Sequence, residues 1–169
     1  VGYQSLYSNT TGSVNTAVGF KAGYANTTGI VIDAFGYQTL DANTTGERNA
    51  AFGAVALSSN TTGSYNIAVG NNALAQNTTA SNNTAVGYQA GYSNTTGSDG
   101  TYVGTQAGYY VTTGLQNTAV GTATLGRNSA TSTTTGNYNS AFGQYSLTAL
   151  QSGSYNTGLG YGALQNNTT

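Results

Sequence analysis

The chain has 169 residues, of which 37% are hydrophobic, and it carries three basic and four acidic side chains for a net charge of −1. The sequence contains no Cys and no His, which excludes disulfides, thiolate metal sites and His-dependent acid–base catalysis. The near-neutral balance disfavours nucleic acid, which needs a basic footprint, and the short apolar runs indicate that this segment does not span a membrane.

An apolar residue followed by Gly recurs along the whole chain, starting at Val1, with a spacing of 17 residues. One step is longer, the 22 residues from Val120 to Phe142. A unit this short suits one coil of a solenoid, which buries its apolar side only when a neighbour stacks on it. The sequence therefore predicts an all-β fold, a parallel β-solenoid (β-roll) of about ten coils that oligomerises.

Each unit is expected to hold two short strands joined by turns. We number the unit from a recurrent Ala as position 1, so that the apolar residue is position 2 and the Gly is position 3. The first strand is predicted at Asn-Thr-Ala-Val-Gly, as in residues 15–19, and the second near positions 5 to 8.

Neighbouring residues of a strand point to opposite faces. We expect position 2 to face the coil interior, opposite Leu at position 7. We expect Ala at position 1 and the small residue at position 6 to face a subunit contact. The predicted core ladder is Val1, Val18, Phe35, Phe52, Val69, Val86, Val103, Val120, Phe142 and Leu159.

Glycine at position 3 is expected at the coil corners, where it permits positive φ or close backbone approach. These turn glycines are Gly2, Gly19, Gly36, Gly53, Gly70, Gly87, Gly104, Gly121, Gly143 and Gly160. At position 7, Gly23, Gly91 and Gly108 replace Leu, and each is followed by Tyr. We expect these Tyr rings to fill the volume of the missing Leu side chains.

The Asn-Thr-Thr sequence at positions 10 to 12 has two interpretations, a turn and an N-glycosylation acceptor. Stacked coils would place the acceptors about 4.7–4.9 Å apart, too close for full occupancy, so the turn is favoured. The candidate glycosylation residues are Asn9, Asn26, Asn43, Asn60, Asn77 and Asn94. Stacked Asn residues are also expected to exchange amide hydrogen bonds along the solenoid axis.

The repeat covers residues 1–169 as a single array, which we expect to be a fragment of a longer fibrous protein. The one long step predicts a loop insertion near 127–136.

Three segments, 15–19, 83–87 and 117–121, read Asn-Thr-Ala-Val-Gly. This motif resembles the Ser-Val-Ala-Ile-Gly type motif of trimeric autotransporter adhesin heads, and the longer segment 83–97 is similar to repeats of bacterial and phage tail-fibre-like proteins. The adhesin resemblance implies a left-handed parallel β-roll built as a trimer. It also implies an extracellular, cell-surface or virion location.

The four acids form no recurrent pair, and Asp33 and Asp41 are eight residues apart within one unit. We therefore expect no enzyme activity, no cofactor and no metal site.

The expected function is the structural or adhesive shaft of a fibre, such as a tail fibre, an adhesin head or an extracellular filament. Candidate contacts to a cell-surface glycan or protein receptor are the Tyr residues at position 4, namely Tyr3, Tyr37, Tyr88 and Tyr161. Two alternatives remain open. One is an ice-binding solenoid, suggested by the regular Thr residues, and the other is a self-assembling filament subunit of open length.

Overall fold

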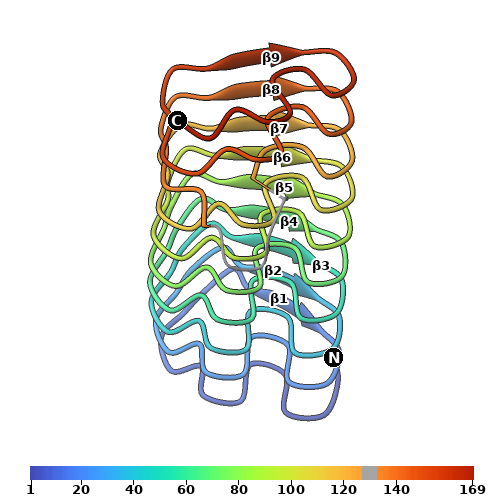
Figure 1. Cartoon of the computed structure of the whole chain (residues 1–169). Helices are drawn as coiled ribbons and strands as arrows, with labels where there is room; N and C mark the ends of the chain where they lie inside the picture. The colour runs from blue at the N-terminus through green and yellow to red at the C-terminus, as the bar shows by residue number, and fades with distance from the viewer. Residues whose placement is uncertain (127–132) are drawn as a thin grey trace.

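The computed structural model describes residues 1–126 and 133–169 and shows a parallel β-solenoid (Figure 1). Nine strands form one sheet in which each strand pairs with its neighbours in sequence. The strands are β1 (Thr16–Val18), β2 (Asp33–Phe35), β3 (Ala50–Phe52), β4 (Ile67–Val69), β5 (Thr84–Val86), β6 (Thr101–Val103), β7 (Thr118–Val120), β8 (Ser140–Phe142) and β9 (Thr157–Leu159). The predicted all-β parallel solenoid with 17 residues per turn is thus confirmed, with about eight turns.

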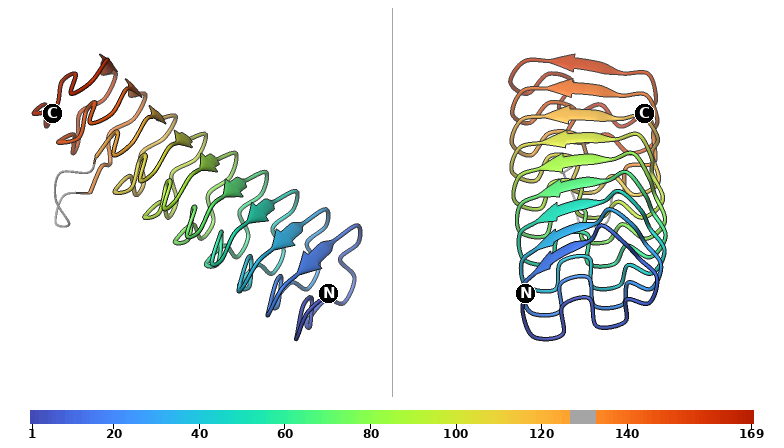
Figure 2. Two further views of the ribbon diagram at one scale, coloured as in Figure 1. Left: turned by 90° about the vertical axis from the view of Figure 1, so that its right-hand side faces the viewer. Right: turned by 180° about the vertical axis from the view of Figure 1, so that it is seen from behind.

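The repeat length keeps equivalent positions in register along the sheet, whose strands line one side of the stack of coils (Figure 2). Val18 pairs with Phe35, and Val120 pairs with Phe142 across the long step, so the additional residues leave the register unchanged. The predicted loop insertion falls largely on residues 127–132, which lie outside the described residues. Thr134 follows this segment and forms a parallel bridge with Val111.

The middle residue of every strand is buried, and its two neighbours point outward. Ala34 is fully buried, whereas Val18 and Phe52 are 39% and 41% exposed. The predicted core ladder is therefore wrong, because position 2 lies on the outer face and position 1 fills the interior. The residues concerned are Val1, Val18, Phe35, Phe52, Val69, Val86, Val103, Val120, Phe142 and Leu159.

The core consists of Ala at position 1, the small residue at position 6 and Leu at position 7. Ala51, Ala56 and Leu57 represent these three positions, and all are fully buried. Leu therefore faces inward as expected, but positions 1 and 6 line the core rather than a subunit contact. The reason is steric, because an interior already occupied by Leu accepts only a small side chain from the facing strand.

No second strand is present at positions 5 to 8 in residues 1–126 and 133–169. Residues at positions 5 and 7 adopt the left-handed region, as Gln38 (φ 50°) and Leu40 (φ 51°) show. Left-handed residues interrupt the alternation of a strand. Hydrogen bonding between coils nevertheless continues, since the Leu40 N–H donates to the Ala56 oxygen at 3.1 Å.

Two large side chains from the facing wall occupy the space beside the position 7 glycines. A Cβ atom on Gly91 would lie 2.7 Å from Cδ2 of Tyr102, and one on Gly108 would also meet this ring. Tyr102 stands at position 1 in place of Ala and is fully buried. Beside Gly23 the buried residue is Ile32. The expectation that the following Tyr fills this space is wrong, because the rings concerned lie only half-buried at the surface: Tyr24, Tyr92 and Tyr109.

Candidate functional site

The Asn of each Asn-Thr-Thr sequence points into the coil and forms a column along the solenoid. Nδ2 of Asn43 donates to Oδ1 of Asn26 in the preceding coil at 2.8 Å and to the backbone oxygen of Gly46 at 3.0 Å. The expected exchange of amide hydrogen bonds is thereby confirmed. The same two bonds recur for Asn26, Asn60, Asn77 and Asn94.

Burial of this column argues against the glycosylation interpretation of Asn-Thr-Thr. A glycan would be attached to the Asn side-chain nitrogen, and in the column both hydrogens of that nitrogen are bonded inside the coil. The fully buried candidates are Asn26, Asn43, Asn60, Asn77 and Asn94. Asn9 is partly buried, and its Nδ2 donates to the Gly12 oxygen at 2.9 Å. The Asn-Thr-Thr-Gly sequence closes a turn, which is the interpretation favoured above.

A second Asn column stands at position 16, immediately before the strands. Oδ1 of Asn49 accepts the backbone N–H of Asn66 at 2.9 Å, and Oδ1 of Asn66 accepts that of Asn83 at 3.0 Å. Wherever Asn stands at this position, the column connects the start of the next strand to the preceding coil, and Ile32 and Gly100 interrupt it. The recurrence of Asn before the strand was the available sequence signal for it, although the sequence did not reveal its burial.

In the part of the chain that the structure describes, two buried side-chain polar atoms lack a hydrogen-bond partner, Oδ1 of Asn94 and the Tyr102 hydroxyl. Position 10 of the next coil is Val111, so the Asn column ends at Asn94. Gly100 occupies position 16 of the same coil, and a Cβ there would lie 2.5 Å from the Tyr102 oxygen. The large ring therefore lies where an Asn side chain would otherwise stand, and burial raises the pKa of Tyr102.

The turn glycines at position 3 adopt positive φ, as predicted, with Gly53 at 130°. A Cβ atom on Gly53 would lie 2.6 Å from the backbone C and O atoms of Gly70 in the next coil. Any side chain at this corner would therefore separate the coils.

The outer face of the sheet carries two ladders, from positions 17 and 2. Position 2 is apolar in every strand, and its exposed members include Val69 and Val86 at 38% each. Position 17 is mostly Thr, and Asp33 is the only charged outward residue of the nine strands, all of which lie in the described part of the chain. The result is an almost uncharged face along the whole sheet.

The two Thr residues of each Asn-Thr-Thr sequence have different environments. The first is half-buried, and its hydroxyl donates to the next coil, as Thr44 Oγ1 does to the Thr61 oxygen at 3.0 Å. The second points outward and is exposed. These residues are Thr11, Thr28, Thr45, Thr62, Thr79 and Thr96, and the exposed ladder continues at the same position with Thr113 and Thr135, which no Asn-Thr-Thr sequence precedes.

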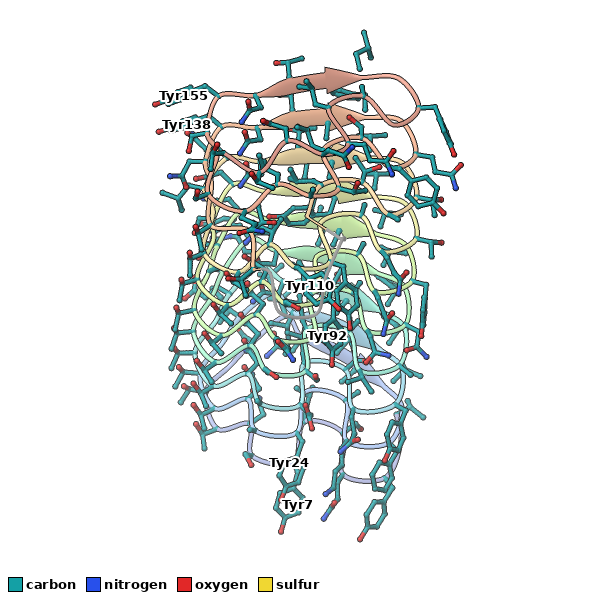
Figure 3. All side chains as sticks on the ribbon, viewed as in Figure 1. Tyr7, Tyr24, Tyr92, Tyr110, Tyr138 and Tyr155 are labelled. Atoms are coloured by element: carbon teal, nitrogen blue, oxygen red, sulfur yellow. The ribbon has the colours of Figure 1, made fainter. Side chains whose placement is uncertain are left out.

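Exposed aromatic residues stack along the axis. The position 4 candidates for receptor contact are all exposed: Tyr3, Tyr37, Tyr88 and Tyr161. The rings of Tyr3 and Tyr37 stack on opposite sides of Phe20, with centroid separations of 5.5 and 5.4 Å. Similar stacks join Tyr7 to Tyr24 and Tyr138 to Tyr155 (Figure 3). Because the stacked rings of Tyr3, Phe20 and Tyr37 cover one another, they offer edges and hydroxyls more than free faces.

Charged side chains are few and scattered over the surface of the solenoid. The Lys21 ammonium lies 5.6 Å from the ring centroid of Phe20 and 5.1 Å from that of Tyr24. Burial raises the pKa of the Asp41 carboxyl above its ordinary value, and Lys21 and backbone hydrogen bonds oppose this rise.

Within residues 1–126 and 133–169 there is no cluster of three or more His, Cys, Asp or Glu that could hold a metal ion. The same residues contain no helix long and apolar enough to cross a membrane. The chain has no significant match among protein-family models, curated proteins or solved structures.

Proposed function

We propose that this chain is part of the structural or adhesive shaft of an extracellular or virion fibre, such as a tail fibre, an adhesin head or an extracellular filament. The observation that carries the proposal is the continuous connection between coils. Strand pairing joins every coil to the next, and two buried Asn columns add side-chain hydrogen bonds along part of the stack. Because each of these connections repeats along the axis, bending the stack would strain all of them together, which favours a stiff rod.

Small-angle X-ray scattering of the purified chain tests this shape. Nine strands at about 4.8 Å spacing give a rod of roughly 40–50 Å whose cross-section is that of one coil. A compact or expanded particle would contradict the proposal. Adding coils by duplicating residues 17–84, which are four repeats, should lengthen the rod and leave its cross-section unchanged.

Adhesion would use the exposed Tyr residues of position 4 to contact a cell-surface glycan or protein receptor. Binding to a glycan array by the wild type, and its loss in Tyr37→Ala and Tyr88→Ala, would support this role. Retention of every bound glycan in these variants would contradict it. Sedimentation of the same samples measures assembly. It distinguishes a homotrimer, which the adhesin resemblance implies, from a filament of open length.

A second candidate function is ice binding, which the exposed position 12 ladder favours because it presents hydroxyls at the coil repeat. Thermal hysteresis that is lost in Thr62→Lys, at the middle of the ladder, would support it. A wild-type chain that shows no thermal hysteresis at high protein concentration would rule out ice binding.

A further inference from the structure

We infer that the outer face of β1–β9 is a self-association surface on which a second copy of this chain packs, sheet against sheet. The inference rests on the proposed shaft function, and it names the partner and the contact face. It replaces the expectation that Ala at position 1 and the small residue at position 6 form the subunit contact, since both are in the core.

The chemistry of this face is that of an interface. Position 2 is apolar in all nine strands, and none of these side chains is buried in the single chain. The rings of Phe35 and Phe52 stack with centroids 4.9 Å apart, so that neighbouring coils form one continuous apolar ridge. A long apolar stripe bordered by Thr is typical of a surface that another molecule covers.

Periodicity identifies the second copy as the occupant. The ridge repeats at the spacing of stacked strands, about 4.7–4.9 Å, and face-to-face sheets pack about 10 Å apart. A partner with the same repeat makes the same contact at every coil, whereas an irregular globular surface fits only locally. The near absence of charge removes the repulsion that would otherwise oppose the meeting of two identical faces. One self-complementary face joins two copies across a two-fold axis, while a closed trimer needs two different complementary patches.

The size of the face sets the strength of the contact. Nine strands at about 4.8 Å and three residues at about 3.3 Å give roughly 400 Å² per copy, or about 800 Å² in total. Stable complexes bury about 1,200–2,000 Å². We therefore expect this segment to pair weakly and reversibly, and a longer array of the same coils to pair more tightly in proportion to its length.

Sedimentation of the full 169-residue chain between about 10 μM and about 1 mM tests the inference. The wild type should show a concentration-dependent monomer–dimer equilibrium. The double variant Phe52→Lys and Val86→Lys places two charges on the face and should weaken dimerisation at least tenfold. The matched control, Thr62→Lys and Thr96→Lys, adds the same charges to the same coils at position 12 and should dimerise like the wild type. Circular dichroism checks that all three are folded.

A cysteine variant supplies a second readout. Val86 lies in β5, at the centre of the sheet, so a two-fold axis at mid-sheet places it near its own copy. The chain has no Cys, and oxidation of Val86→Cys should give a disulfide-linked dimer faster than oxidation of Thr96→Cys. A wild type that stays monomeric, or an oligomer that survives the Phe52→Lys and Val86→Lys substitutions, would overturn the inference. A rod-shaped monomer would leave the shaft proposal standing, whereas a compact particle would overturn the shaft itself.

Discussion

Replacing Asn60 by Ala tests whether the buried Asn column holds the coils together. Nδ2 of Asn60 donates to Oδ1 of Asn43 and to the Gly63 oxygen, and its Oδ1 accepts from Asn77. The Gly63 oxygen keeps a partner in the variant, because Asn49 also donates to it at 2.7 Å. The substitution therefore leaves one buried acceptor, Asn43 Oδ1, and one Asn77 N–H without partners.

Each buried polar group left without a partner costs about 1–3 kcal/mol. For these two groups together we expect Asn60→Ala to lower the free energy of unfolding by about 2–6 kcal/mol, measured by urea denaturation. The control Thr62→Ala alters an exposed side chain of the same coil and should change it by no more than about 0.5 kcal/mol.

Asn94→Ala provides a second test, because the Asn column of position 10 ends at Asn94. Its Oδ1 already lacks a partner, so the substitution orphans only the Oδ1 of Asn77 and removes an existing unpaired atom. We expect Asn94→Ala to cost about 1–2 kcal/mol less than Asn60→Ala. Equal costs for the two Asn variants, or a cost of Asn60→Ala no larger than that of Thr62→Ala, would refute the reasoning.

Four further substitutions give independent predictions, each measured by thermal or urea unfolding. Gly53→Ala should destabilise the chain by more than about 3 kcal/mol, because its Cβ meets the next coil and its φ is positive. Tyr102→Phe should stabilise by about 1 kcal/mol, since it removes a buried hydroxyl without a partner. Val31→Asn should stabilise by about 1 kcal/mol, because a β-branched residue is strained at φ 55°. The raised pKa of Asp41 means that its ionisation opposes folding, so stability should fall as pH rises above the ordinary carboxyl range, and Asp41→Asn should abolish this fall.

The architecture could be predicted because it depends on spacing alone. A fixed repeat with Gly at position 3 requires equivalent residues to stack, and Val18 does pair with Phe35. The left-handed residues at positions 5 and 7 could not be predicted in the same way. Gln38 and Leu40 do not favour positive φ, and the contacts of the stacked coils impose it.

The face of the strand that points inward could not be decided from alternation, which places positions 1 and 2 on opposite sides without saying which is inside. A signal was present in the size of the residues. Tyr102 is the one large residue at position 1, and it lies between Gly91 and Gly108, which lack the usual Leu. A large residue compensated by small ones indicates contact between positions 1 and 7, and hence that position 1 is in the core.

In the same packing, the side chains that fill the interior of the coil are different from those on its outer face. Ala34 and Leu40 fill an interior in which hydrogen-bonded Asn side chains supply the remaining contacts. The larger Val and Phe side chains of position 2 lie outside that interior, on the outer face, where Val86 remains 38% and Phe52 41% exposed. Their apolar character along the whole sheet is therefore not required by the fold of a single copy. Lys at Phe52 or Val86 should consequently leave the solenoid folded and weaken the contact with whatever covers the outer face. The Lys variants measure these two effects separately.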